Sequence, residues 1–147
     1  GLPVSCYRST MNESRSTRIA FDQRFHPAAP VLPVGIGGLD SDSPTTMLRM
    51  LVDTGADCSL IPVSVARALR LPLVDKVNMR GVGTETATPV PVHAAQVLIG
   101  GTRLVARLMA FQEEALLGRD VLNLLKIELD GPAGWLSFSA PSHRRRK

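Results

Sequence analysis

The sequence predicts an all-β protein, a small closed barrel-like body with two short helices. From Pro30 onward, short apolar runs alternate with glycine-containing turns such as Gly37-Gly38, Gly100-Gly101 and Asp130-Gly131. Only two segments carry the start and stop signals of a helix. The 147 residues, with 44% hydrophobic content, are enough for one domain with its own core. Short strands joined by tight turns are typical of barrels and sandwiches.

The first elements are predicted from apolar runs and from the Gly and Pro residues that interrupt or end them. Residues 31–36 are expected to form a strand, with Pro33 at an edge or a bulge, before a turn over Gly37–Asp40. Thr46–Val52 has four large apolar residues and one charge, as a strand buried on much of both faces would. A helix is predicted over Pro62–Leu69, with Pro62 at its first position and Ser59 upstream as a possible cap.

The second half of the chain is predicted to contain two hairpins, a helix and a strand pair. Residues 76–92 form a hairpin around 81–84, and residues 93–111 form another around Gly100-Gly101. Leu116–Leu125 is expected to be the second helix, begun near Gly118. The final strand pair, residues 126–129 and 135–138, turns at Asp130-Gly131-Pro132.

Composition divides the chain into three parts. Residues 1–29 are rich in Ser, Thr, Arg and Asn without a sustained period, so we expect a flexible leader or a loosely packed arm. Residues 30–140 form the folded domain, and residues 141–147 a disordered basic tail. Three apolar side chains of the first segment could dock on the body: Ile19, Phe21 and Phe25. Because the first residue is Gly rather than Met, upstream sequence, including a membrane anchor, could be missing.

Charge and composition exclude several classes of function. The net charge is +4, and residues 143–147 alone carry four positive charges, so the body is near neutral. Nucleic acid is not an expected partner, because one Trp and one Tyr cannot interleave aromatic rings with the basic tail. No run of 18 apolar residues predicts a membrane span in this chain. Without a disulfide framework or a secretory apolar region, a cytosolic setting is favoured.

Neither a metal nor another cofactor is expected. The histidines at 26, 93 and 143 lie far apart, and Cys6 and Cys58 have no zinc-ligand spacing. Cys58 with His93 as its base would suggest a cysteine protease, yet no thiol-protease signature surrounds it. Cysteine is often simply buried, so we predict that Cys58 is an inert core residue.

Asp53 is the first candidate for chemistry. An apolar strand leads directly into Asp53-Thr54-Gly55, and a carboxylate there is costly unless it is paired, hydrogen-bonded or used. Gly55 allows a sharp turn and a close backbone approach, while the Thr54 hydroxyl can hydrogen-bond across it. The alternative is that Asp53 only caps a turn, as we expect for Asp130.

Three motifs in order carry a family resemblance. They are Leu-Val-Asp-Thr-Gly-Ala-Asp at 51–57, Gly-Val-Gly-Thr at 81–84 and Ala-Leu-Leu-Gly-Arg-Asp-Val-Leu at 115–122. The chain resembles the retropepsins, the retroviral-type aspartic proteases, over roughly residues 30–140. In that family an active-site loop is followed by a glycine-rich flap and then by a helix introduced by Gly-Arg. The resemblance implies the retropepsin barrel with a flap hairpin.

The resemblance implies that Asp53, Thr54 and Gly55 are the catalytic residues. Peptide hydrolysis of this type needs two carboxyl groups about 3 Å apart, only one of them ionised. The sequence contains no second Asp-Thr-Gly or Asp-Ser-Gly. Two copies related by a two-fold axis would supply the pair, so a homodimer is expected.

Other residues acquire roles through the same resemblance. Ala56 and Asp57 are implied to bind the substrate backbone. The flap residues implied to cover the substrate are Gly81, Val82, Gly83 and Thr84, although an ordinary hairpin turn is the alternative. Gly118 and Arg119 are implied to support the site, with Arg119 paired to Asp57.

Two alternatives stay open for Val82, Ile61 and Leu116. They either shape the pockets that hold substrate side chains or belong to the core. Viral members commonly have Asn where this chain has Asp120, which indicates a cellular or bacterial member.

These expectations define an aspartic endopeptidase that cleaves extended peptide or protein segments and that could remove residues 1–29 by self-processing. The alternative is a catalytically silent retropepsin-like module for dimerisation or binding. The sequence indicates neither the cleavage-site preference nor the biological substrate.

Overall fold

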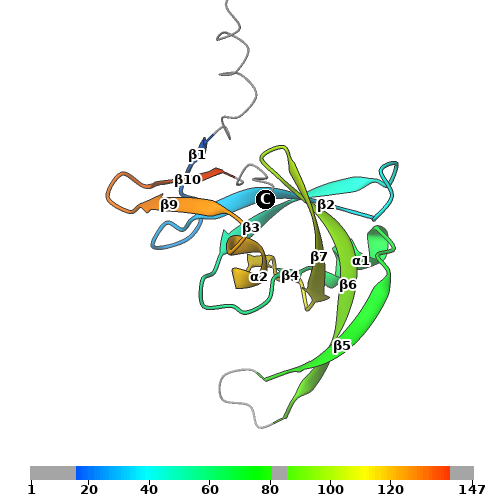
Figure 1. The fold of residues 1–147 in the computed structure, drawn as a ribbon. Helices are drawn as coiled ribbons and strands as arrows, with labels where there is room; N and C mark the ends of the chain where they lie inside the picture. Colours follow the sequence, from blue (N-terminus) through cyan, green and yellow to red (C-terminus); the bar gives the residue numbers. More distant parts are fainter. Residues whose placement is uncertain (1–15, 81–85, 140–147) are drawn as a thin grey trace, which may run out of the picture.

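The computed structural model describes residues 16–80 and 86–139. Within these residues the chain is mostly β with two short helices, as predicted (Figure 1). The strands are β1 Thr17–Ala20, β2 Val31–Gly37, β3 Thr45–Val52, β4 Leu60–Ile61, β5 Leu73–Met79, β6 Thr88–Ile99, β7 Thr102–Ala110, β8 Leu116–Leu117, β9 Lys126–Asp130 and β10 Trp135–Ser139. The helices are α1 Val63–Ala68 and α2 Arg119–Leu122. No helix among the described residues is long and apolar enough to cross a membrane.

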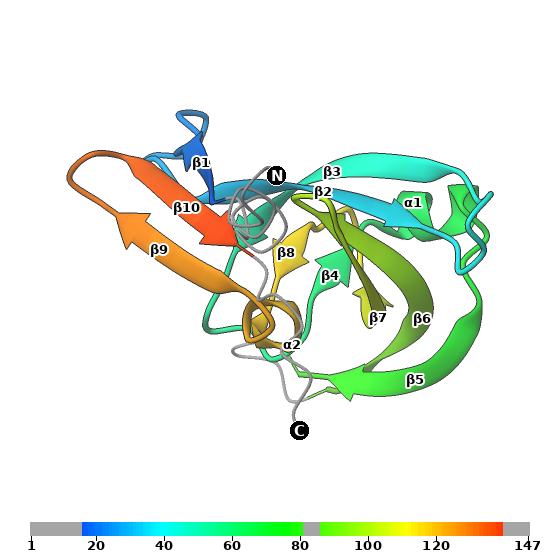
Figure 2. The same cartoon turned by 45° about the horizontal axis from the view of Figure 1, so that its top comes forward.

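Seven strands form one sheet that closes on itself. Their order is β2-β3-β8-β4-β7-β6-β5, and β2 pairs additionally with β6 over Gly35–Gly37. This extra pairing joins the two sides of the sheet into a barrel, which Figure 2 shows with β5 on its outside. The expected closed body is therefore present, and β5 is left as an edge strand of the described sheet.

Strand β6 belongs to both predicted hairpins. It pairs with β7 across Gly100 and Gly101, whose φ values of 55° and 82° suit glycine at a tight turn. It also pairs with β5 as far as Met79 and Thr88, so the strands of the hairpin predicted over residues 76–92 are paired as expected. The predicted flap residues at its tip, 81–84, lie outside the described residues.

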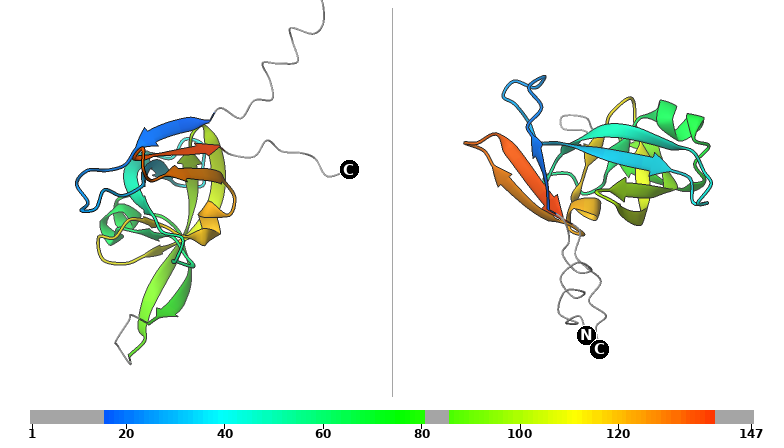
Figure 3. Two further views of the ribbon diagram at one scale, coloured as in Figure 1. Left: turned by 90° about the vertical axis from the view of Figure 1, so that its left-hand side faces the viewer. Right: turned by 90° about the horizontal axis from the view of Figure 1, so that it is seen from above.

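A smaller sheet, of order β1-β10-β9, lies beside the barrel (Figure 3). Its β9–β10 hairpin confirms the predicted final strand pair. Strand β1 lies within the segment assigned to a leader or arm, and the Arg18 guanidinium stands 3.8 Å from the centre of the Trp135 ring. Of the three apolar candidates for docking, Ile19 and Phe21 pack against the main core, whereas Phe25 is 41% exposed.

The buried apolar side chains fall into two clusters. The main one fills the barrel, with Leu32, Met50 and Leu108 fully buried among others. The second contains four buried residues: Leu60, Val90, Val92 and Met109. Val77, Met79, Phe111 and Leu116 pack against it. This second cluster packs side chains of the β5–β6 hairpin against Leu60 of β4 and Met109 of β7.

Three local predictions are wrong. Leu116 and Leu117 form strand β8, not a helix, because they pair in parallel with Leu51 and Val52 of β3, and α2 ends at Leu122. Ser59 does not cap α1, because its hydroxyl donates to Asp120. Cys58 is exposed rather than a core residue, because it lies in the loop that leaves β3.

Candidate active site

The end of β3 places Asp53 at the rim of the barrel. Strand β8 runs parallel to β3, and the Asp53 N–H donates to the carbonyl of Leu117 at 2.9 Å. On the other side, the Val52 N–H donates to the Pro30 carbonyl at 3.0 Å. The backbone is therefore held on both sides just before the acid, whose side chain is half-buried.

The turn after β3 orients the Asp53 carboxylate. Its Oδ1 accepts a hydrogen bond of 3.0 Å from the Gly55 N–H, and its carbonyl accepts one of 3.2 Å from the Ala56 N–H. Thr54 and Gly55 are exposed. The predicted catalytic triplet thus presents an oriented carboxylate beside two residues that are open to an approaching chain.

Arg119, the first residue of α2, braces this turn from below. Its Nη1 donates to the carbonyl of Thr54 at 2.8 Å, and its Nη2 forms an ion pair with Asp57. Its backbone N–H donates to the carbonyl of Ala56 at 2.9 Å. The predicted pairing of Arg119 with Asp57 is present, and the planar guanidinium holds two points of the loop at once.

Gly118 allows α2 to approach the loop. A Cβ atom at this position would stand 2.7 Å from the carbonyl carbon and oxygen of Cys58 and 2.9 Å from the Ala56 oxygen. All three are backbone atoms, which cannot rotate away as a side chain could. The contact requires glycine because of space, since the φ of −92° is open to any residue.

A hydrogen-bond network that joins the buried Ser59 to the exposed Asp120, and that the sequence did not predict, completes the support. Ser59 is fully buried, donates its hydroxyl to Asp120 Oδ1 at 2.7 Å and its N–H to Oδ2 at 3.0 Å. The Ser59 hydroxyl also accepts from the Gly118 N–H at 2.9 Å. Asp120 further accepts from its neighbour Val121. The only available signal was a polar residue between apolar neighbours in Cys58-Ser59-Leu60.

A cavity of about 490 Å³ lies beside the turn. The loop contributes Gly55, Ala56, Asp57 and Cys58, so the predicted substrate-binding residues Ala56 and Asp57 face the same space. The opposite side comes from the β5 hairpin, and the remaining lining residues are Leu60, Val77, Asn78, Met79, Arg80 and Met109. The predicted flap residues lie outside the described residues, and strand β5, which precedes them, borders this cavity.

Of the three residues expected to be either pocket or core residues, the structure describes Ile61 and Leu116. Ile61 is fully buried in the main core and does not line the cavity. Leu116 is half-buried and packs against the second cluster. Val82 lies outside the described residues. The apolar lining instead includes Leu60 of β4, Met109 of β7, and Val77 and Met79 of β5. Val77 and Met79 are two positions apart, as residues on one face of a strand are.

The surroundings of Cys58 do not favour thiol chemistry. Partial desolvation of the sulfur raises the pKa of Cys58, and the nearby Asp120 and Asp57 carboxylates add to the effect. A raised pKa keeps the thiol protonated and weakly nucleophilic near neutral pH. His93 is engaged elsewhere, with its Nδ1 3.0 Å from the Leu71 carbonyl oxygen. In the part of the chain described, no cluster of three or more His, Cys, Asp or Glu side chains could hold a metal ion.

Three solved structures are similar to this chain. A retropepsin-like aspartic protease from Rickettsia conorii matches 87% of this chain and 94% of its own, with a TM-score of 0.56 and 16% identity. The EIAV protease complexed with the inhibitor HBY-793 matches 65% and 86% with 25% identity and a TM-score of 0.48. The retroviral protease-like domain of Ddi1 from Leishmania major matches 80% and 98% with 15% identity and a TM-score of 0.49. The match to the Rickettsia protein shows a retropepsin-like fold.

The family is shown by sequence. The family model described as aspartyl protease matches residues 32–121, which include the Asp53 loop, β5 and the first three residues of α2. This chain therefore belongs to the retropepsin-like aspartyl protease family. No curated protein matches it.

Proposed function

We propose that this protein is an aspartic endopeptidase that works as a homodimer, with Asp53 of each copy contributing to one active site. The observation that carries the proposal is the support of Asp53: Gly55 orients its carboxylate, and Arg119 fixes the turn around it. A loop that only reversed the direction of the chain would not need an arginine that contacts both the Thr54 carbonyl and Asp57. Membership of the aspartyl protease family is the reason to interpret the oriented Asp53 carboxylate as a catalytic acid.

The dimer follows from the number of acids. A single Asp53 cannot both accept a proton from water and donate one to the substrate carbonyl. A second copy, related by a two-fold axis, would bring its own Asp53 to the same place across the exposed Thr54 and Gly55. Two adjacent carboxyls ionise in separate steps, so one stays protonated while the other is charged.

The reaction then proceeds by acid and base catalysis. The ionised carboxylate takes a proton from the shared water as its oxygen bonds to the scissile carbonyl carbon, and the protonated carboxyl gives its proton to the carbonyl oxygen. In the tetrahedral diol that forms, the carboxyl that took the proton from water gives it to the amide nitrogen. A diol hydroxyl returns a proton to the other carboxylate as the C=O bond forms again and the C–N bond breaks. Ala56 and Asp57, on the wall of the cavity, would hold the extended substrate backbone.

Cleavage by wild type and Asp53→Asn tests the proposal. Both are incubated with a peptide library at about pH 4 to 7, with and without an active-site-directed aspartic protease inhibitor. Asp130→Asn, at the last residue of β9, is the matched control. The wild type and the control should cleave and be inhibited, and Asp53→Asn should not. Equal cleavage by wild type and Asp53→Asn would rule out the mechanism, and peptide binding without cleavage by either would favour the silent module.

Dilution tests the dimer separately. If the site needs two copies, specific activity falls as the protein concentration drops below the dissociation constant. Sedimentation over the same concentrations should show dimers giving way to monomers. A strictly monomeric species with full activity would rule out the shared site.

A further inference from the structure

The chain between β1 and β2 folds into a closed loop. The N–H of Asp22 donates to the Ala29 carbonyl at 2.7 Å, and the N–H of Ala29 donates to the Asp22 carbonyl at 3.2 Å. Just before this loop, the Phe21 N–H donates to the Gly134 carbonyl in the turn between β9 and β10, at 2.8 Å. We call residues 21–30 the N-terminal strap. Its start is therefore fixed to the small sheet, and its closed loop leads toward the barrel.

The Asp22 carboxylate lies at the centre of the strap, with a side chain that is only 5% exposed. The backbone N–H of Arg24 donates to its Oδ1 at 2.9 Å, and the Arg24 guanidinium donates to both oxygens. From β3, the Nη2 of Arg49 donates to its Oδ2 at 2.9 Å. A buried carboxylate is costly without such partners. Asp22 therefore joins the strap both to itself and to the strand that carries Asp53.

The strap ends beside the candidate catalytic residue. Its last residue is Pro30, whose carbonyl accepts the Val52 N–H at 3.0 Å, and Val52 directly precedes Asp53. The register of β2 with β3 ends at this point, where Val31 lies beside Leu51. The ends of such ladders open more readily than their centres. The position of the backbone at Asp53 therefore depends on what holds Pro30 in place.

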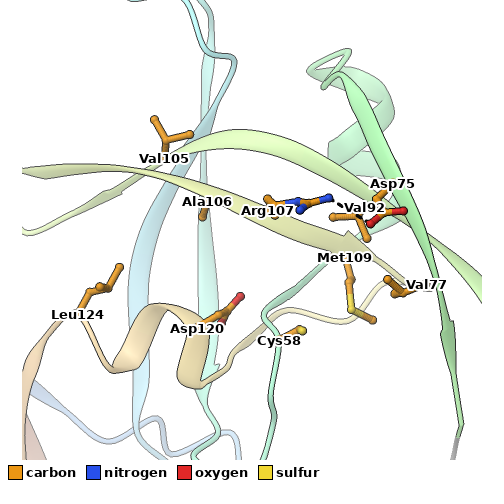
Figure 4. Close-up of a pocket in the computed structure, with 10 residues that line it drawn as sticks. All are labelled: Cys58, Asp75, Val77, Val92, Val105, Ala106, Arg107, Met109, Asp120 and Leu124. Carbon is orange, nitrogen blue, oxygen red and sulfur yellow. Dashed lines mark hydrogen bonds and ion pairs between the residues drawn. The ribbon is translucent and has the colours of Figure 1, made fainter.

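An exposed ion pair in the same barrel provides a contrast. Arg107 of β7 and Asp75 of β5 lie 3.1 Å apart (Figure 4), and both side chains are more than half exposed. An exposed pair of this kind contributes little to stability. The Asp22 carboxylate is instead shielded from water, so removing one of its two arginines leaves a buried charge less well paired. The bond between Arg49 and Asp22 should therefore have a measurable effect on the strap.

We propose that Asp22 is a positioning residue for Asp53. Through Arg49 and the closed loop it holds Pro30 against Val52, and so it determines where β3 presents the acid. The kinetic part of this inference rests on the proposed function, because the position of Asp53 affects cleavage only if Asp53 is catalytic. Asp22 itself acts on the backbone and not on the substrate.

Two variants break the link at different points. Asp22→Asn removes the charge at the centre of the strap, and Arg49→Gln removes only the bond from β3. The Arg49 side chain is 55% exposed, so Arg49→Gln should fold even if Asp22→Asn does not. Arg103→Gln, at an exposed position on β7, is the control. Cleavage of one peptide is measured with kcat and KM determined separately, at a protein concentration that sedimentation shows to keep each variant dimeric.

Arg49→Gln should lower kcat by about tenfold with little change in KM, because a small displacement of a reacting group reduces the rate more than the binding. Asp22→Asn should lower kcat at least as much. The double variant should lose no more than Asp22→Asn alone, because Arg49 acts through Asp22. Arg103→Gln should behave as wild type. An unchanged kcat, an effect on KM alone, or additive losses in the double variant would overturn the positioning role.

Hydrogen exchange separates this inference from the proposed function. NMR compares exchange at the Val52 N–H with exchange at the Met109 N–H, which donates to the Ser59 carbonyl at 3.1 Å. Arg49→Gln should speed exchange at Val52 by about tenfold and leave Met109 unchanged. This result supports the hold of the strap on the Asp53 backbone even if the wild type cleaves no peptide, in which case only the proposed function fails. Unchanged exchange at Val52, or equal acceleration at both amides, overturns the positioning role whatever the cleavage assay shows.

Discussion

Ser59 and Asp120 join the loop after Asp53 to α2 through two hydrogen bonds, at 2.7 and 3.0 Å, between residues 61 positions apart in the chain. The hydroxyl and the backbone N–H of Ser59 both donate to Asp120, and so does the N–H of Val121. A carboxylate only accepts, so it can satisfy all three donors. The identity of residue 120 is thus determined by the direction of its hydrogen bonds.

Asp120→Asn should lower the free energy of unfolding by about 1–3 kcal/mol, because the amide NH2 would face the donating N–H of Ser59 and leave it unsatisfied. Urea unfolding measures the loss. Asp40→Asn, at an exposed turn position, is the control and should change little. Equal stability of Asp120→Asn and wild type would show that the network does not depend on an acceptor.

Gly118→Ala should destabilise the fold and impair the site. The added methyl group would meet the backbone of Cys58 and Ala56 at 2.7–2.9 Å, and overpacking of this kind costs about 1–3 kcal/mol or more. Gly131→Ala is the matched control, since a Cβ there has nothing within 4 Å. Thermal unfolding of the two variants measures the difference, and an equal effect at both positions would contradict the close approach of α2.

Arg119→Lys should reduce kcat/KM for peptide cleavage by about tenfold or more while the protein stays folded. Lysine keeps the charge but cannot reach the Thr54 carbonyl and Asp57 together. Arg103→Lys, at an exposed position on β7, provides the comparison. Unchanged kinetics of Arg119→Lys would mean that the charge alone suffices.

Asp22 should make stability depend on acid pH. Hydrogen bonds from the Arg24 side chain and N–H, and from Arg49 on β3, hold the pKa of Asp22 well below its usual range, against the opposing effect of burial. A lowered pKa stabilises the fold fully above about pH 4, and this contribution is lost as the pH falls toward the folded-state value.

Replacing Asp22 with Asn should remove that dependence. Asp22→Asn should be less stable than wild type at neutral pH, and the difference should shrink as the pH is lowered below about 4. Urea midpoints across this range provide the measurement, with Asp42→Asn, an exposed acid, as the control. A difference that is independent of pH would contradict the role of the carboxylate charge.

The predictions that succeeded rest on local patterns. The apolar run before Asp53 identified β3, and Gly100-Gly101 identified the turn between β6 and β7. Pro33 is exposed and pairs on one side only, as its missing N–H suggested. In each case the signal and the structure lie within a few residues of one another.

The predictions that failed concern residues whose structure is decided by distant partners. Leu116 and Leu117 are extended because β3 needs a parallel neighbour. Ser59 looked like a cap for the nearby α1, yet its partner is Asp120. The residues next to each segment in the sequence do not indicate such distant partners.

The parallel pairing of β3 with β8 also has a consequence during protein synthesis. Asp53 leaves the ribosome well before Leu117, Arg119 and Asp120, which hold its loop in place. A chain that is still being translated therefore carries the acid without the support that orients it. If the protein is the proposed endopeptidase, the nascent chain should show no cleavage activity until the residues of α2 have emerged.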